Sequence, residues 1–234
     1  MMLASEGPSA LPLWINGHAF LTMTDDFQTV SNPVTGEALR LVPMCGAEEL
    51  LLAIEASNIA IPSWASSTID IRQAILETTA SLLEKFSAHF TQILQEETGL
   101  DEAAATVEVN QACTALKTAN PKLGSKYSLC AVINDASQPF ATPVRLIAEI
   151  LAAGQFVIIK PSVKAPSVLF AFAELTGRAG LPAGVLNLVQ GDDKIISAIA
   201  ESPLIIDITF AGQANIAEKI QAQMNLHQKN MVLA

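Results

Sequence analysis

Apolar and polar residues follow two different rhythms along this chain of 234 residues. Between residues 47 and 118, apolar side chains recur at every third or fourth position, which is typical of helices that bury one face. After Tyr127, short apolar runs alternate with amphipathic segments. The pattern therefore predicts a helical layer in the first half and a strand-and-helix repeat in the second half.

The first half predicts short strands followed by three helices. Residues 14–17 fit a strand entering a turn, and residues 27–42 fit a hairpin with a Pro/Gly turn. Apolar spacing predicts helices over residues 47–64, 71–94 and 102–118. Gly99 follows the second of these helices as a stop signal.

The second half predicts a parallel sheet. Its strands fall at residues 128–133, 156–159, 185–189, 204–210 and 230–233. Single helices separate them, over residues 142–153, 165–178, 193–200 and 215–225. Connections of this length are too long for hairpins, so consecutive strands should run parallel through right-handed crossovers.

The predicted fold class is α/β, with a Rossmann-like, open and mainly parallel sheet of about five strands. Helices should cover both faces, and an N-terminal β-hairpin and helical layer should precede the sheet. We expect residues 1–126 to form the hairpin and helical layer, and residues 127–234 to form the sheet.

Composition narrows the class of protein. Half of the residues are hydrophobic and 15% are charged, which indicates a packed globular chain. The formal net charge of −10 would repel phosphate backbones and anionic lipid headgroups, so nucleic-acid and membrane partners are not expected. The first basic residue is Arg40, so no secretory signal is visible, and we predict a cytoplasmic protein.

Cysteine and histidine positions indicate no metal site. Cys45, Cys113 and Cys130 are odd in number, widely spaced and outside any C-x-x-C pair, so neither a disulfide framework nor a zinc site is implied. Buried thiols are the plain interpretation. The three histidines are scattered, without acidic residues at ligand spacing.

The stretch from Leu151 to Gly191 organises the second half. An apolar strand ends in the turn Lys160-Pro161-Ser162, a helix follows, and a Gly-Leu-Pro stop leads into the next strand. Open α/β sheets usually bind ligands at the carboxyl ends of their strands. The polar turn is therefore a candidate ligand site.

Seven short motifs in register carry a resemblance to a known family. They are an Asn-Pro-x-Thr-Gly-Glu turn, an arginine on a helix, Glu-Thr-Gly, Leu-Ala-Ala-Gly, Lys-Pro-Ser, Gly-Leu-Pro-x-Gly-Val-Leu-Asn and Phe-Ala-Gly, starting at residues 32, 72, 97, 151, 160, 180 and 210. Their order and spacing resemble the NAD(P)-dependent aldehyde dehydrogenase superfamily over nearly the whole chain. The resemblance implies the N-terminal half of these enzymes, with most of the cofactor domain.

By this resemblance, the catalytic groups lie outside the chain. The family's mechanism uses a cysteine thiolate that attacks the aldehyde and a glutamate base that activates water. The resemblance places the cysteine beyond residue 234 and the glutamate at or next to Ala234. The catalytic domain is therefore expected to be absent, and no catalytic residue is assigned.

One site that the resemblance places inside the chain is altered. The family's Pro-Trp-Asn segment corresponds to Asp135, Ala136 and Ser137, so a hydroxyl replaces the amide that stabilises the oxyanion. Ser137 could donate one hydrogen bond from a shorter side chain. Loss of one oxyanion donor typically costs roughly a hundredfold in rate.

The resemblance assigns four cofactor-binding residues: Lys160 near the adenosine ribose, Ser162 in the same turn, and Gly212 and Gln213 at the pyrophosphate turn. For Lys160, a ribose contact and a solvated lysine at a strand end are equally open. Val163 replaces an acid that would accept from ribose hydroxyls. Gln213 can still donate, but its bulk could fill the phosphate position.

Two acids add to these departures. Asp192 and Asp193 precede a predicted helix, which they would cap. They would also repel an incoming diphosphate. We therefore expect the binding of NAD or NADP to be weak or lost.

Three functions are compatible with these observations. The favoured one is a truncated, degenerate aldehyde-dehydrogenase-like protein without dehydrogenase activity of its own, either a pseudoenzyme or an interaction module. A protein partner or a second copy would then cover the face left by the missing catalytic domain. The second is half of an NAD(P)-dependent aldehyde oxidoreductase completed by a separate chain, and the third is a dinucleotide-binding module without chemistry. Ser137, Val163 and Gln213 count against the second, because a complementing chain would not repair them.

Overall fold

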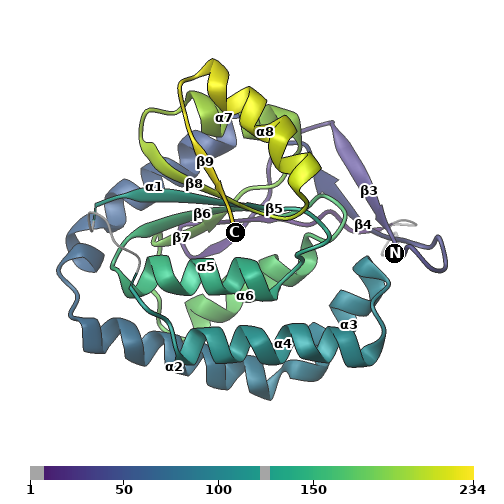
Figure 1. Cartoon of the computed structure of the whole chain (residues 1–234), viewed down its shortest axis with the longest axis horizontal. Helices are drawn as coiled ribbons and strands as arrows, with labels where there is room; N and C mark the ends of the chain where they lie inside the picture. Colours follow the sequence, from purple (N-terminus) through teal and green to yellow (C-terminus); the bar gives the residue numbers. More distant parts are fainter. Residues whose placement is uncertain (1–7, 122–126) are drawn as a thin grey trace, which may run out of the picture.

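The computed structural model describes residues 8–121 and 127–234. A sheet of seven strands forms the centre of this part of the chain, and helices cover both faces (Figure 1). Its strands are β1 (Leu13–Ile15), β2 (His18–Phe20), β5 (Leu129–Asn134), β6 (Phe156–Lys160), β7 (Leu186–Leu188), β8 (Ile205–Ala211) and β9 (Met231–Leu233).

The strand order is β2-β1-β7-β6-β5-β8-β9. The five strands from β7 to β9 run parallel, as the sequence predicts. Residues of β5 and β6 are buried at every position, because both faces of these apolar strands are covered. The strand predicted at residues 14–17 corresponds to β1, which pairs with β2 and, through Trp14 and Leu188, adds the hairpin to the sheet beyond β7 in antiparallel direction. The sequence pattern did not indicate β2 or this pairing.

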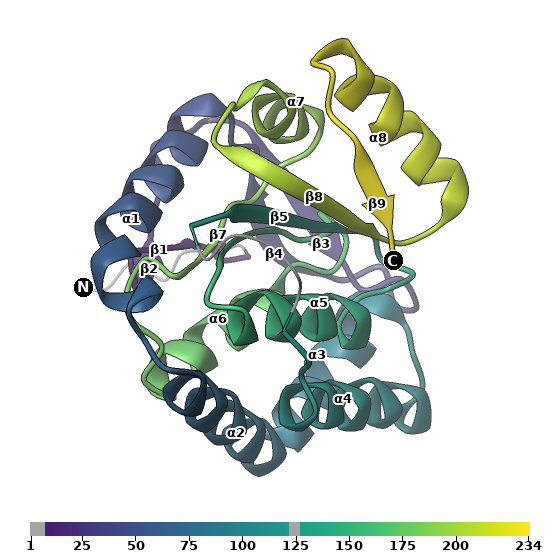
Figure 2. The ribbon, with the colours of Figure 1, turned by 60° about the vertical axis from the view of Figure 1, so that its left-hand side comes forward.

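Helices form one layer on one face of the sheet and two on the other (Figure 2). They are α1 (Ala47–Ala65), α2 (Ile69–Lys85), α3 (Ser87–Thr98), α4 (Glu102–Lys117), α5 (Ala141–Ala152), α6 (Ser167–Arg178), α7 (Asp193–Glu201) and α8 (Ala214–Leu226). The first layer holds α1, α7 and α8, while α5 and α6 cover the opposite face and α2 to α4 pack outside them. Among these described helices, none has the length and apolar character that a membrane span requires.

The α/β class, the open parallel sheet and the preceding hairpin and helical layer are therefore confirmed. The division expected between residues 126 and 127 remains a prediction, since residues 122–126 lie outside the described part.

The single helix predicted over residues 71–94 is wrong, because the chain forms two helices there. Phe86 leaves helical geometry, with φ −103° and ψ 15°, and ends α2 before α3 begins. Leu83 and Phe90, on either side of the break, are both buried. The break lets each helix turn its own apolar side inward, and no glycine or proline signals it in the sequence.

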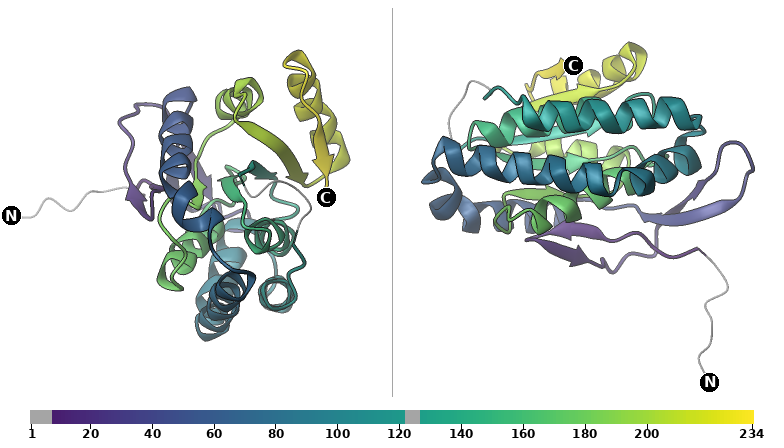
Figure 3. Two further views of the ribbon diagram at one scale, coloured as in Figure 1. Left: turned by 90° about the vertical axis from the view of Figure 1, so that its left-hand side faces the viewer. Right: turned by 90° about the horizontal axis from the view of Figure 1, so that it is seen from below.

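The predicted hairpin of residues 27–42 forms a separate two-stranded sheet of β3 (Phe27–Ser31) and β4 (Ala38–Pro43). Figure 3 shows it projecting beyond the helical layers. Asn32 closes its turn by accepting hydrogen bonds from the amides of Val34 (2.8 Å) and Thr35 (3.1 Å).

Asn187 on β7 joins three parts of the fold through hydrogen bonds. Its amide nitrogen donates to the carbonyls of Ala53 (3.2 Å) and Gly184 (2.9 Å) and to Oγ of Ser57 (3.0 Å). Its oxygen accepts from the amide of Asn16 (2.9 Å). The side chain is fully buried, so these bonds fix α1, β7 and the β1–β2 turn against one another.

Candidate functional site

The sheet changes direction between β5 and β8. The chain builds from β5 through β6 to β7 on one side, then crosses to β8 and β9 on the other. Such a reversal leaves a crevice beyond the carboxyl ends of the two strands, where open α/β sheets bind ligands. A pocket of about 260 Å³ lies at this place, lined by residues of α7, α8 and the segments that follow β5 and β6. We call it the switch-point pocket.

Two helices contribute apolar side chains to the wall of the switch-point pocket. Ile196 comes from α7, and Ile216 and Ile220 come from α8. Residues four apart share one face of a helix, so both α8 isoleucines face the same way. Apolar walls with a few polar groups are the usual composition of small-molecule sites.

Lys160 ends β6 and lines the pocket, with only 6% of its surface exposed. Burial lowers the pKa of its ammonium group to about 8, and the carboxylates of Asp192 and Asp193 oppose part of that shift. The described residues provide no ion-pair partner for it. Lys160 is therefore buried, which excludes the alternative of a solvated lysine at the strand end. A contact between Lys160 and a ribose remains a prediction.

The turn that follows β6 is fixed by its neighbours. Ser162, a pocket residue, accepts at Oγ from the amide of Lys164 (3.2 Å). Buried Glu97 accepts from the amide (3.0 Å) and Oγ (2.5 Å) of Ser167 at the start of α6, and burial raises the pKa of this carboxyl. Val163 lines the pocket and packs against apolar residues of the β3–β4 hairpin, and its hydrocarbon side chain offers no acceptor to a ligand.

Two buried acceptors of pocket residues have no hydrogen-bond partner. Asn134 is 2% exposed, and its Nδ2 donates to the carbonyls of Asp135 (3.1 Å) and Gln138 (3.0 Å), but its Oδ1 is unpaired. Oε1 of Gln223, on α8, is also buried and unpaired. Buried polar atoms are nearly always paired, so each exception needs a reason. A ligand with amino or hydroxyl groups would supply the donors.

Gly212 and Gln213 contact an acid of the chain itself. The Asp135 carboxylate accepts from the amide of Gln213 (2.9 Å) at the start of α8, and from the amide (2.8 Å) and hydroxyl (2.6 Å) of Ser137. A side chain at Gly212 would lie 2.5 Å from Cγ of Asp135, so only glycine permits this approach. The Gln213 side chain is exposed and outside the pocket wall, whereas Asp135 lines the pocket.

The three cysteines and Ser137 do not line the switch-point pocket. Ser137 donates its hydroxyl proton to Asp135. Cys45, Cys113 and Cys130 are all buried, and none lines the switch-point pocket. Burial raises the pKa of Cys45 to about 12 and that of Cys113 to about 11, so both are thiols at neutral pH.

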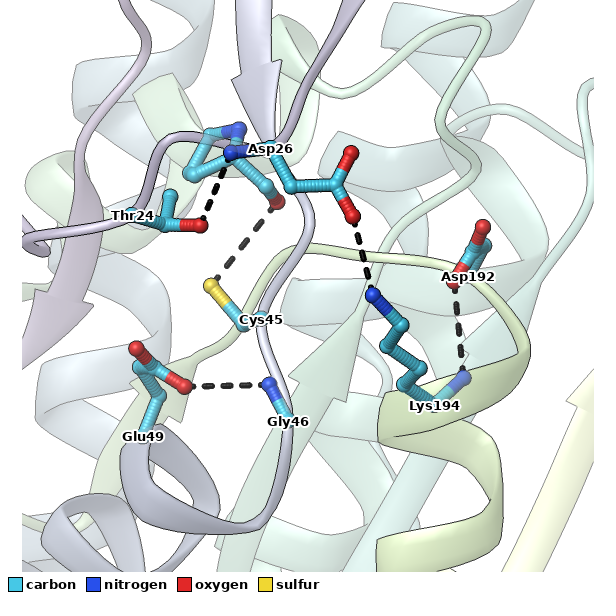
Figure 4. Close-up of polar contacts among 8 residues, drawn as sticks. Thr24, Asp26, Cys45, Gly46, Glu49, Asp192 and Lys194 are labelled. Carbon is cyan, nitrogen blue, oxygen red and sulfur yellow. Dashed lines mark hydrogen bonds and ion pairs between the residues drawn. The ribbon is translucent and has the colours of Figure 1, made fainter.

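A separate polar cluster joins the start of α7 to the hairpin β3–β4 (Figure 4). Asp192 caps α7, as predicted, by accepting from the amide of Lys194 (3.4 Å). The ammonium group of Lys194 points away and pairs with Asp26 (2.9 Å). The carboxylates of Asp192 and Asp193 also act on Lys160, whose pKa they raise against the effect of burial.

Larger hollows lie on the outer surface. One of about 410 Å³ between α4 and α5 includes Val107 and Arg145, and one of about 480 Å³ beside β8 and β9 includes Ile206. Arg145 is already paired with Glu149 (2.8 Å). Neither hollow holds an unpaired buried acceptor among the described residues. We therefore take the switch-point pocket as the candidate ligand site, although it is smaller, because its polar groups could orient a ligand.

The structure brings two of the four predicted binding residues, Lys160 and Ser162, to the pocket wall. It places Gly212 and Gln213 beside the pocket, at the start of α8. The contributors that the sequence prediction missed include Asn134, Ile196, Ile216, Ile220 and Gln223. The spacing of the last three on one predicted helix was the only local signal.

Sequence comparison places the chain beside enzymes that oxidise aldehydes. The sequence model of the Aldehyde dehydrogenase family matches residues 20–128 and 127–234. Malonate-semialdehyde dehydrogenase of Pseudomonas aeruginosa is 32% identical over 83% of this chain and 43% of its own length. N-succinylglutamate 5-semialdehyde dehydrogenase of Salmonella heidelberg is 31% identical over 92% of this chain and 47% of its own. The chain spans about half the length of the curated relatives it matches.

Solved structures also superpose on nearly the whole of this chain and on about half of their own length. An NADP-dependent enzyme of Escherichia coli superposes with a TM-score of 0.86 at 27% identity, over 96% of this chain and 51% of that one. A protein of Sinorhizobium meliloti, named for methylmalonate-semialdehyde dehydrogenase activity and solved with NAD, gives 0.88 at 25% identity, over 97% and 50%.

Proposed function

This chain belongs to the aldehyde dehydrogenase family, and from that premise we propose that it binds the adenosine part of a nucleotide without oxidising aldehydes by itself. The observation that carries the proposal is the composition of the switch-point pocket. Its described wall holds groups suited to binding a base and a ribose, and no cysteine.

The size and polarity of the pocket support a nucleoside-sized ligand. Pockets for drug-sized ligands enclose about 300–1,000 Å³, so one of about 260 Å³ suits a nucleoside better than a whole dinucleotide. Ile196 and Ile220, from opposite helices, would pack against a flat base, and Lys160 and Ser162 would donate to ribose hydroxyls. The two solved relatives are described with NAD and NADP, which both contain adenosine.

The same residues fit only one end of such a cofactor. Bound NAD or NADP would supply a hydride acceptor for aldehyde oxidation. A diphosphate, however, would meet the Asp135 carboxylate at the start of α8 and the Asp193 carboxylate on α7. The residues present therefore support adenosine binding and weak binding of the whole dinucleotide.

Two observations support the lack of aldehyde chemistry. Thiolate attack needs an accessible cysteine with a lowered pKa, whereas burial raises the pKa of Cys45 and Cys113. The hydroxyl of Ser137, at the expected oxyanion position, already donates to Asp135. Because its hydroxyl proton is bonded to Asp135, Ser137 would not stabilise a tetrahedral adduct.

Two assays on the purified full chain test the proposal. With NAD or NADP and a semialdehyde, we expect no reduced nicotinamide to form, and turnover that Lys160→Ala abolishes would overturn this expectation. In calorimetry, we expect adenosine to bind and Ile220→Glu to abolish binding. The matched control is Val107→Glu, in the hollow between α4 and α5, which should bind adenosine like the wild type.

The edge strand β9 favours a second candidate function, in which another chain or a second copy covers this side of the sheet. β9 pairs with β8 alone in the described sheet, and Val232 (63%), Leu233 (46%) and Ile206 (64%) are exposed. Unprotected edge strands readily pair with another strand. Light scattering at increasing protein concentration should then show association that Val232→Lys reduces, and a monomer throughout would count against self-association.

A further inference from the structure

We propose that Asp135 is an internal occupant of the anion position in the switch-point pocket, which makes the pocket selective for nucleosides over nucleotides that carry phosphate next to the ribose. The inference rests on the proposed adenosine binding and deepens it, because it states which part of a cofactor the pocket accepts.

The position of Asp135 follows from the sheet. Asn134 pairs with Ala211 in the last register position that β5 and β8 share. Asp135 and Gly212 are the next residues on the two strands, so the carboxylate lies where the strands separate. This is the place where a sheet of this topology binds its ligand.

The start of α8 would otherwise attract an anion. The first amides of a helix are unpaired and carry a partial positive charge, which makes them a binding place for phosphate or carboxylate. α8 has no acidic residue in its first turn, and the side chain of Gln213 does not cap it. The Asp135 carboxylate, from a strand 78 residues away in sequence, accepts from the Gln213 amide instead.

The carboxylate is held in place from several sides. Its two oxygens accept three hydrogen bonds, from Gln213 and from the amide and hydroxyl of Ser137. It lies so close to Gly212 that a Cβ there would clash at 2.5 Å. A phosphate would have to displace this side chain, and like charges would oppose its entry.

Independent features of the same pocket point to a polar ligand. Oδ1 of Asn134, in a side chain 2% exposed, is an unpaired acceptor. Lys160 is 6% exposed and has no ion-pair partner among the described residues. Unpaired donors and acceptors therefore remain for a base and a ribose, while the Gln213 amide at the start of α8 is already bonded to Asp135.

Calorimetric titration of the full chain with adenosine, ADP and NAD tests the inference. The wild type should bind adenosine at least roughly tenfold more tightly than ADP. Asp135→Ala should gain at least roughly tenfold in affinity for ADP and NAD, with adenosine affinity little changed. Asp135→Asn should gain less, because it removes the charge and keeps the size.

Asp101→Asn is the matched control. Asp101 also caps a helix, by accepting from the amide of Ala104 (2.8 Å), and it lies outside the pocket wall. This variant loses the same charge and should bind all three ligands like the wild type. A gain in ADP affinity equal to that of the Asp135 variants would overturn the inference.

An unchanged affinity for ADP and NAD in both Asp135 variants would also overturn it. If circular dichroism shows that Asp135→Ala does not fold, Asp135→Asn decides the question, because it can still accept the hydrogen bonds at the start of α8. The proposed function fails if the wild type does not bind adenosine. The inference about Asp135 is tested separately, by the change in ADP affinity between the wild type and the Asp135 variants.

Discussion

Two asparagines of the same sheet have different surroundings. Asn187, on β7, is fully buried, and both its nitrogen and its oxygen are hydrogen-bonded. Asn134, at the end of β5, is just as buried, but its oxygen is unpaired. A fully paired amide specifies the fold, whereas an unpaired one at the carboxyl end of a strand indicates a place for a ligand.

The same contrast extends to the other unpaired atoms. Among the described residues, buried side-chain atoms without a partner belong to Asn134, Gln190, and Gln223. Gln190 follows the carboxyl end of β7, and Gln223 lines the switch-point pocket from α8. Unpaired polar groups therefore gather on the ligand side of the sheet, away from the helical layer of α2 to α4.

The largest effect on stability is expected at the paired asparagine. Asn187→Leu would remove the hydrogen bonds to Asn16, Ala53, Ser57 and Gly184 from a fully buried position. Each such bond contributes about 0.5–1.5 kcal/mol, so we expect the free energy of unfolding to fall by about 3 kcal/mol. Urea denaturation measures this, and a loss below about 1 kcal/mol would show that the network does not support the fold.

A gain in stability is expected at the buried lysine. The folded pKa of Lys160, about 8, lies below its ordinary value of 10.5, so the folded chain pays for a buried charge at neutral pH. One pKa unit corresponds to about 1.4 kcal/mol, and we expect Lys160→Met to raise the free energy of unfolding by about 2 kcal/mol at pH 7. Urea denaturation at that pH provides the measurement.

The pH dependence gives a sharper test of the same lysine. Between pH 8 and 10.5 the unfolded chain binds more protons at this residue than the folded chain, so wild-type stability should rise with pH relative to Lys160→Met. Lys219→Met, which removes one positive charge from an exposed lysine at the pocket, is the matched control. A constant difference between wild type and Lys160→Met across this range would contradict the lowered pKa.

The smallest effects are expected for two glutamines of α8. Gln223→Met removes an unpaired acceptor and should change the free energy of unfolding by less than about 0.5 kcal/mol, while adenosine affinity falls about fivefold. Gln221→Met is the matched control, because Gln221 donates to the Lys229 carbonyl (3.1 Å) and accepts from the Met231 amide (2.9 Å). It should lower stability by about 1 kcal/mol and leave adenosine affinity unchanged. A stability loss in Gln223→Met together with an affinity loss in Gln221→Met would contradict this distinction between paired and unpaired groups.

The sequence predicted the sheet well because its signal is local. Apolar runs such as that of β6 and the stop at Gly180 lie within single segments, and five parallel strands follow from them. The break at Phe86 was missed because it depends on how α2 and α3 pack, and no residue type signals it.

The site was predicted only in part for the same reason. Lys160 and Ser162 sit in one short motif, so their place at a strand end could be inferred. The bond between Asp135 and the Gln213 amide joins residues far apart in the chain. The unpaired state of Asn134 depends on every neighbour that could have bonded to it, so no sequence pattern encodes it.

Amide chemical shifts in NMR test directly whether adenosine binds in the switch-point pocket. We expect the perturbed amides to lie around this pocket, at the end of β5, in the turn after β6, and on the facing sides of α7 and α8. Perturbations confined to the hollow between α4 and α5, or none at all, would contradict it.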